Sequence, residues 1–87
     1  MKYLDFERIK KIDELIQKWI RDNKRQIATP DMVIVKLVEE GFYSDNQTAL
    51  EQFTEEIRKM TKKEQREYLN IHHIGVKEFR FKNRDNF

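Results

Sequence analysis

The segment formed by residues 29–41 constrains the fold of this chain more than any other. It contains the longest uninterrupted apolar run, at residues 32–35, together with the only proline and one of the two glycines. The sequence on either side is charged and amphipathic. We therefore expect this segment to be buried on several sides, with the remaining elements packed around it.

Boundary signals at both ends of this segment predict a helix over residues 30–40. Thr29 precedes a proline, which disfavours helical backbone angles and suits an N-cap. Pro30 fits the first helical position, where no backbone N–H is needed. Gly41 stands where a C-terminal glycine cap belongs.

A buried strand is the competing interpretation of residues 32–35, because β-branched residues favour sheets. The spacing of Ile34 to Leu37 and Val38, at three and four residues, favours the helix. Residues 27–28, just before this helix, are expected to be extended.

An amphipathic helix is predicted over residues 4–22. Apolar positions recur at intervals of three and four, as a helix packed on one face requires. They are Phe6, Ile9, Ile12, Leu15, Ile16, Trp19 and Ile20. The stripe is heptad-like for only two repeats, fewer than the roughly three or four that indicate a coiled coil. We therefore prefer core packing to a dimer seam.

Two capping-box patterns predict helices over residues 45–60 and 62–70. The boxes are Ser44-x-x-Gln47 and Thr61-x-x-Glu64. Spacing predicts a buried stripe on the first of these helices, at Leu50, Phe53, Ile57 and Met60.

The C-terminal segment changes to a period of two over residues 76–82. Phe79 and Phe81 fall on one face, and Arg80 and Lys82 fall on the other. The pattern predicts a short strand or an extended arm.

Together these elements predict an all-α or nearly all-α fold. It is a single compact domain of four helices spanning residues 1–87, with a short extended C-terminal strand or arm. A length of 87 residues suits one domain, since domains typically contain about 100–150 residues. A chain this short buries only about 60–65% of its unfolded surface, so association with a partner would add stability.

The charges are distributed unevenly along the chain, although the net charge is only +2. Residues 1–26 carry eight basic and five acidic side chains, residues 27–60 carry three and seven, and residues 61–87 carry seven and four. The ends are therefore basic and the middle is acidic. We favour packing of the basic ends near the acidic centre over a dedicated basic surface.

The compartment is predicted from what the sequence lacks. There is no cysteine, so a disulfide framework and a thiolate metal site are excluded. The N-terminus shows no apolar signal-peptide core, and no apolar run approaches the roughly 20 residues of a membrane span. We expect a soluble, cytoplasmic protein that does not bind membranes.

Residues for catalysis or metal binding are scarce. Two glycines are too few for a phosphate loop or a dinucleotide fingerprint. Ser44 is the only serine and is predicted to be a helix cap. His72 and His73 are adjacent, so their side chains diverge, and we expect solvated or capping residues at the end of the 62–70 helix. The sequence predicts no enzyme, no catalytic residue, no cofactor and no metal site.

Nucleic-acid binding is one of two functional hypotheses. The order of a helix, a turn, a Thr-Pro-Asp helix, a glycine turn, another helix and a basic extended tail is similar to a winged helix-turn-helix layout, over about residues 5–82. The chain departs from that layout in having the large Leu37 four positions before Gly41, and in having Gln47 where an apolar residue is expected. The helix that would read bases also displays several acidic side chains, which repel phosphate.

A basic surface formed by the first helix and the tail is the nucleic-acid interface that remains. Phe79 and Phe81 could stack on the bases of a single strand, although core packing is the interpretation we prefer for them. The candidate cations are Lys10, Lys11, Lys18, Arg21, Lys24, Arg25, Lys77, Arg80, Lys82 and Arg84.

Docking on a protein partner is the hypothesis that the sequence favours, as an adaptor, an inhibitor or a subunit. So small a core is not expected to bury every aromatic residue, and aromatic residues are enriched at interface hot spots. Homodimerisation is part of this hypothesis. The candidate contact residues are Trp19, Tyr43, Phe79, Phe81 and Phe87.

Overall fold

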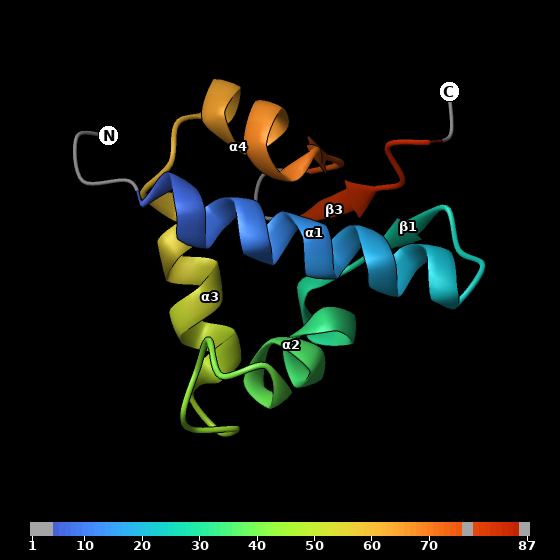
Figure 1. Ribbon diagram of the computed structural model, residues 1–87. Coiled ribbons are helices and arrows are strands. Elements are labelled where there is room, and N and C mark those ends of the chain that lie inside the picture. The colour runs from blue at the N-terminus through green and yellow to red at the C-terminus, as the bar shows by residue number, and fades with distance from the viewer. Residues whose placement is uncertain (1–4, 76–77, 86–87) are drawn as a thin grey trace.

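The first helix, α1 (Phe6–Asp22), runs across the middle of the molecule in the computed structural model (Figure 1). The structure describes residues 5–75 and 78–85. In this view α2 and α3 lie below α1, and α4 and β3 lie above it. The described residues form four helices and a three-stranded antiparallel sheet, so the fold is predominantly helical but not all-α.

The inward face of α1 contains four residues of the predicted apolar stripe together with Gln17, which was not predicted. The buried positions are Ile9, Ile12, Ile16, Gln17 and Ile20. Phe6 is 57% exposed, and Leu15 and Trp19 are half-buried, so these three positions of the predicted stripe lie at its edge. The carboxylate of Asp5 caps the first turn by accepting the backbone N–H of Arg8. Residue 4, where the helix was predicted to begin, lies outside the described residues.

The helix predicted over residues 30–40 is α2, Pro30–Glu39, and the alternative of a buried strand is wrong. Thr29 is the extended N-cap, and its hydroxyl donates to the carboxylate of Asp31. Gly41 has a φ of +87°. The backbone N–H groups of Gly41 and Phe42 donate to the carbonyls of Val38 and Leu37, both at 3.0 Å. This is a Schellman cap, as the glycine predicted.

The expectation that residues 29–41 are buried on several sides is wrong. Val33 and Leu37 are buried, whereas Met32 is 37% exposed and Val35 is 62% exposed. A helix turns about 100° per residue, so four consecutive apolar residues cannot all face one side. Only one face of α2 packs on the core.

The helix predicted over residues 45–60 is α3, Ala49–Arg58, and it begins later than its apparent capping box indicated. Ser44 does not cap it. Asp45 instead forms a turn, because its side chain accepts the backbone N–H of Gln47 (2.9 Å) and its carbonyl accepts that of Ala49 (2.8 Å). Leu50, the second residue of α3, is 37% exposed, while Phe53 and Ile57 are buried as predicted.

The second capping box is confirmed at the start of α4, Lys62–Leu69. The hydroxyl of Thr61 accepts the backbone N–H of Glu64 (3.1 Å), and the carboxylate of Glu64 accepts that of Thr61 (2.7 Å). The second of these bonds lowers the pKa of Glu64. Asn70 ends the helix in the left-handed conformation, with a φ of 51°.

The sheet contains β1 (Ile27–Ala28), β2 (Ile71–His73) and β3 (Phe79–Lys82) in the order β1-β3-β2. The extended conformation predicted at residues 27–28 and 79–82 is confirmed, and residues 76–77 lie outside the described residues. Strand β2 was not predicted, and it places His72 and His73 on a strand instead of a helix end. Strands of two or three residues are too short to show a period of two.

The core lies where the sheet meets α1, α2 and α3. Phe81 pairs with Ala28 on one side and Ile71 on the other, and all three side chains are buried. The ring of Phe81 stacks on that of Phe53, with centroids 5.9 Å apart. The C-terminal strand therefore completes the core.

A second contact fixes α1 to α3 near their adjoining ends. The guanidinium of Arg8 donates to the carboxylate of Glu56 (2.9 Å), which also accepts the hydroxyl of Tyr43 (3.0 Å). The Arg8 guanidinium lies 5.2 Å from the centre of the Tyr43 ring. Burial, and then the charge of Glu56, raise the pKa of Tyr43, so its hydroxyl remains a donor.

Replacing Gly41 with alanine should destabilise the protein by about 1 kcal/mol, because a side chain is disfavoured at positive φ. An added Cβ at Gly41 would contact nothing within 4 Å, so the cost is conformational and not steric. Gly75→Ala is the matched control, since an added Cβ there also meets nothing and its φ is outside the left-handed region. Urea unfolding followed by circular dichroism measures both. Equal stability of the two variants would contradict this account of Gly41.

Candidate functional site

The outward face of the sheet carries positive charge. Since side chains alternate along a strand, burial of Phe81 turns its neighbours Arg80 and Lys82 to the other side. Register places His72 opposite Arg80, and Ile27 opposite Lys82. Arg66 of α4 is close enough that its charge acts on His72. We call Arg66, His72, Arg80 and Lys82 the basic sheet face.

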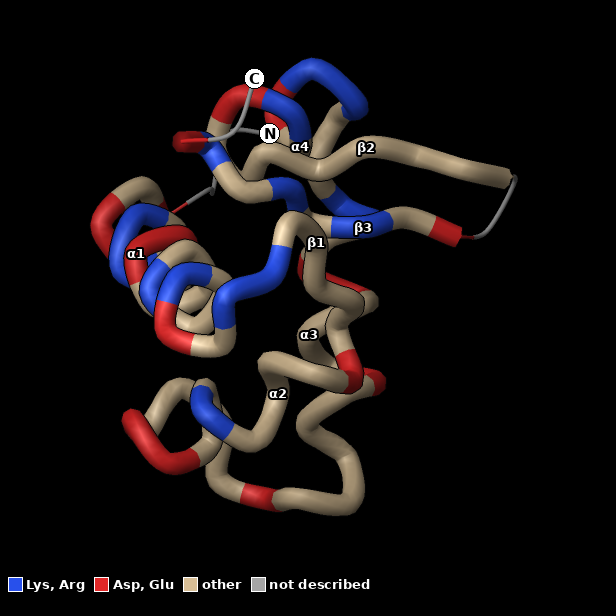
Figure 2. The backbone as a smooth tube through the Cα atoms, turned by 90° about the vertical axis from the view of Figure 1, so that its right-hand side faces the viewer, with Lys and Arg blue, Asp and Glu red and all other residues tan. Residues whose placement is uncertain are grey.

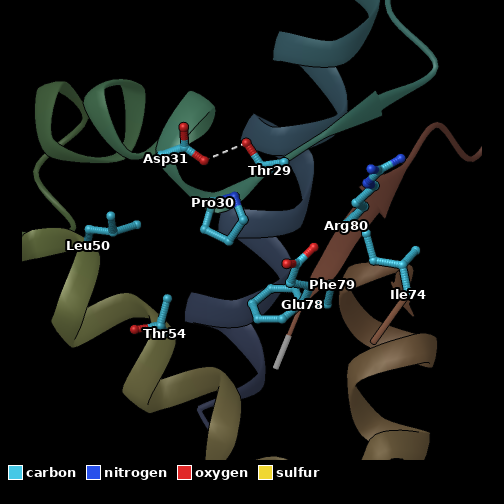
Figure 3. Close-up of a pocket in the computed structure, with 9 residues that line it drawn as sticks. All are labelled: Thr29, Pro30, Asp31, Leu50, Thr54, Ile74, Glu78, Phe79 and Arg80. Carbon is cyan, nitrogen blue, oxygen red and sulfur yellow. Dashed lines mark hydrogen bonds between the residues drawn. The ribbon is translucent and has the colours of Figure 1, made fainter. Parts of the chain in front are cut away.

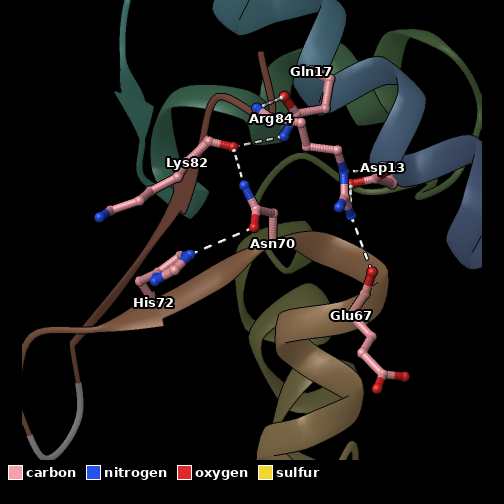
Figure 4. A network of polar contacts seen from close by, with 7 residues as sticks. All are labelled: Asp13, Gln17, Glu67, Asn70, His72, Lys82 and Arg84. Atoms are coloured by element: carbon pink, nitrogen blue, oxygen red, sulfur yellow. Dashed lines mark hydrogen bonds and ion pairs between the residues drawn. The ribbon is translucent and has the colours of Figure 1, made fainter. Parts of the chain in front are cut away.

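His72 lies among these cations in a defined hydrogen-bonding position (Figure 4). Its Nε2 is 3.4 Å from the Oδ1 of Asn70, whose Nδ2 donates to the carbonyl of Lys82 (2.9 Å). With Oδ1 as the acceptor, Nε2 carries the proton and Nδ1 is the atom that a further proton would occupy. Burial, and then the charges of Lys82 and Arg66, lower the pKa of His72, so the ring is neutral at neutral pH.

A polar network holds this part of the sheet against α1 and α4 (Figure 4). Gln17 donates to the carbonyl of Lys82 (2.8 Å) and accepts the backbone N–H of Arg84 (2.9 Å). The Arg84 guanidinium donates to both oxygens of Asp13, at 3.1 and 3.2 Å, and to the carbonyl of Glu67 (3.2 Å). Arg84, a predicted nucleic-acid contact, is therefore engaged in anchoring the tail.

Asp13 is the buried partner in this network. Its side chain is 17% exposed, against 38% for that of Arg84. Burial raises the pKa of Asp13 even though the guanidinium of Arg84 acts in the opposite direction. The ion pair with Arg84 thus offsets part of the free-energy penalty of burying the charged carboxylate of Asp13.

The other predicted cations do not form one surface. Lys18 pairs with Asp22 (3.4 Å), and Arg21 lies 4.0 Å from Asp85. The guanidinium of Arg25 covers the ring of Trp19, at 5.8 Å from its centre. Lys10 and Lys11 are exposed near the N-terminal end of α1, whereas Lys24 is in the turn after its C-terminal end. Lys77 lies outside the described residues.

Three members of the basic sheet face have no acidic partner, a property that they share with Lys10, Lys11, Lys24 and Arg25 among the described residues. Within residues 5–75 and 78–85, the side chains of Arg66, Arg80 and Lys82 take part in no ion pair. Figure 2 shows Lys and Arg gathered over α4, β3 and the turn before β1, while Asp and Glu predominate at α2, α3 and the loop between them. Among the described residues one ion pair, Arg8–Glu56, joins a basic end of the chain to its acidic middle. Within the described residues, no acidic side chain therefore offsets the charges of Arg66, Arg80 and Lys82 by an ion pair.

Two of the predicted docking aromatics are inside the protein. Phe81 is fully buried and Tyr43 is 6% exposed. Phe79 is half-buried, packed edge-on against Phe81 and beside the ring of His73. Trp19 is half-buried beneath Arg25, and Phe87 lies outside the described residues. The aromatic residues named from the sequence therefore do not assemble into one surface.

Sequence reasoning missed Arg66 and His72. Arg66 lies on the predicted 62–70 helix, and nothing in the sequence indicates that this helix packs near residues 80–82. His72 belongs to β2, whose three residues contain no periodic signal. The pairing of β2 with β3 places His72 opposite Arg80, and Arg66 of α4 is close enough to act on His72.

Comparison with known proteins gives no match, whether with protein-family models, curated proteins or solved structures. In the part of the chain that the structure describes, no group of three or more His, Cys, Asp or Glu side chains could hold a metal ion. The described helices include none that is both long and apolar enough to cross a membrane.

Arg84→Met should destabilise the protein by about 1 kcal/mol, at the low end for a charged hydrogen bond because Arg84 is partly exposed. Asp13 would be left buried without its partner, and its folded-state pKa would rise further above its unfolded value. The folded state then binds the proton more tightly, so the deficit should be largest at neutral pH and shrink at mildly acidic pH.

Urea unfolding at the two pH values measures this effect. Arg66→Met, which removes an exposed cation without an ion pair, is the control and should change stability little. A deficit for Arg84→Met that does not depend on pH would show that Asp13 is not the group responsible.

Proposed function

We propose that this protein binds the phosphate backbone of duplex nucleic acid through the basic sheet face. The observation that carries the proposal is the grouping of exposed Arg66 and Lys82 with half-buried Arg80 around His72, none of the three forming an ion pair within the described residues. Fixed cations of this kind bind nucleic acid by displacing the counterions of the phosphates. The burial of Tyr43 and Phe81 removes part of the support for the protein-docking hypothesis and favours this one.

The layout of the chain supports the proposal. Strand β1 follows α1, and the β2–β3 hairpin follows the remaining helices, in the position of the wing in a winged helix-turn-helix arrangement. Helix α4 is inserted between α3 and the hairpin, which is a departure from that arrangement. The hairpin carries Arg80 and Lys82, so the sheet is the natural point of contact with nucleic acid.

The chemistry of α3 argues against its insertion into a groove. Glu51 and Glu55 are exposed on this helix, and their charges repel phosphate. Contact with the backbone instead of base edges carries little sequence information. We therefore propose non-specific binding, for which dissociation constants of about 10⁻⁴–10⁻⁶ M are usual at physiological salt.

A duplex is preferred to a single strand because few rings are available for stacking. Phe81 is buried, and Phe79 is packed between Phe81 and His73. Single-strand binding depends strongly on stacking of bases on exposed aromatic rings. The positive charge of the sheet surface could bind the phosphates of single-stranded or duplex nucleic acid. Duplex binding, however, requires contacts to the phosphate backbone alone and no stacking on aromatic rings.

The double variant Arg80→Gln, Lys82→Gln should weaken binding to a generic DNA duplex. Each lost phosphate contact lowers the dependence of log K on log salt by about 0.9, so the slope should fall by about 2. Fluorescence anisotropy of a labelled duplex over a series of salt concentrations measures both quantities.

The matched control is Lys36→Gln, Lys59→Gln, which removes the same charge from α2 and the end of α3. It should leave the salt slope nearly unchanged. Equal losses in the two double variants would indicate a response to net charge alone and would contradict a located interface.

Binding should tighten as the pH falls from neutral to mildly acidic. His72 is then protonated beside Arg66, Arg80 and Lys82, which stay charged throughout, and a bound phosphate raises its pKa by offsetting their repulsion. Proton uptake therefore accompanies binding, and His72→Gln should flatten the pH dependence of the dissociation constant at fixed salt.

His73→Gln is the control, because His73 faces Gln65 (2.7 Å) and not the cations of the face. Its pH dependence should match that of the unmodified protein. A dependence that persists in His72→Gln would assign the proton to another group.

A further inference from the structure

A groove of about 350 Å³ lies where the start of α2, the exposed side of α3 and the β2–β3 hairpin meet (Figure 3). Its apolar lining comes from all three elements, and consists of Pro30, Leu50, Ile74 and Phe79. The backbone N–H of Ile74 donates to the carbonyl of Glu78 (3.0 Å), which holds the hairpin side of the groove in place. The groove is therefore built on connected secondary structure.

Two of the five exposed large apolar side chains of the described residues line this groove. Leu50 is 37% exposed and Ile74 is 52% exposed. Exposed apolar surface is unfavourable in water, and its concentration in a concave site is typical of a contact surface. Leu50 lies in the first turn of α3, and Ile74 directly follows β2.

The polar groups around the apolar lining include two carboxylates. Figure 3 shows the Pro30 ring between Asp31 of α2 and Glu78 of the hairpin. Asp31 accepts a hydrogen bond from Thr29, and within the described residues neither carboxylate forms an ion pair. Arg80 of the basic sheet face also lines the groove, so the charged groups of the lining are two carboxylates and one guanidinium, with a net charge of −1.

We propose that this groove docks a segment of a partner protein in which an apolar side chain is flanked by Lys or Arg. The apolar side chain would enter between Leu50 and Ile74, and the flanking cations would pair with Asp31 and Glu78. A second copy of this chain offering the same groove is a poorer occupant, because it would bring the carboxylates of both copies together. The lining keeps an excess of one negative charge after Arg80 is counted, and this excess favours a basic partner.

A random peptide library displayed on phage, selected against the intact protein, tests this proposal. The enriched peptides should share an apolar residue next to Lys or Arg. A synthetic, fluorescent copy of the enriched peptide should bind Leu50→Ser and Ile74→Ser about tenfold more weakly, as expected for truncated anchor residues. The pair of substitutions Asp31→Asn and Glu78→Gln should weaken binding and reduce its salt dependence.

Val35→Ser is the matched control, because Val35 is 62% exposed on α2 but does not line the groove. It should bind the peptide with unchanged affinity. Circular dichroism confirms that each variant is folded, and duplex binding by Leu50→Ser should be unchanged, since the basic sheet face is intact. The absence of duplex binding would therefore not contradict peptide docking in the groove. Likewise, the absence of peptide binding would not contradict duplex binding by the basic sheet face.

Three results would overturn the proposal: no enriched peptide, an acidic consensus, or equal affinity for Leu50→Ser and the unmodified protein. Analytical ultracentrifugation supplies a further test. Self-association that is lost in Leu50→Ser but kept in Val35→Ser would assign the groove to a second copy of the chain.

Discussion

The rest of the structure depends on the burial of Phe81 against Phe53. The two rings stack at a 17° interplanar angle, and Phe81 is held between Ala28 and Ile71 across the sheet. The same alternation that turns this ring inward turns Arg80 and Lys82 outward. The position of the positive surface is therefore a consequence of hydrophobic packing, with Gln17 and Asn70 fixing the adjoining carbonyl of Lys82.

Helices were predictable where the sequence contains local signals that no tertiary contact opposes. Pro30, Gly41 and the Thr61–Glu64 capping box each mark a boundary that the structure keeps. Ser44 shows the limit of such signals, because the carboxylate of the adjacent Asp45 forms a turn in its place. The predicted all-α fold omitted the sheet because β1 and β2 contain two and three residues, and their pairing is set by β3.

The candidate sites were less predictable than the helices, since each depends on which residues meet in space. The sequence predicted both Arg80 and Arg84 as contacts to nucleic acid. The structure pairs Arg84 with Asp13, whereas Arg80 forms no ion pair within the described residues. Alternation correctly placed Arg80 and Lys82 on one face, but it could not bring Arg66 or His72 beside them. The groove was not predictable either, because Leu50 was expected to be buried.

The order of the strands in the sheet has a consequence for folding during synthesis on the ribosome. Strand β3 lies between β1 and β2, which do not pair with each other, yet it is synthesised after both. Until residues 79–82 emerge from the exit tunnel, neither outer strand has a neighbour and the ring of Phe53 lacks its cover. The pairing of β1 with β3 joins residues far apart in the sequence, and contacts of this kind slow folding. A nascent chain stalled before this strand would thus expose apolar surface, which is the feature that chaperones bind.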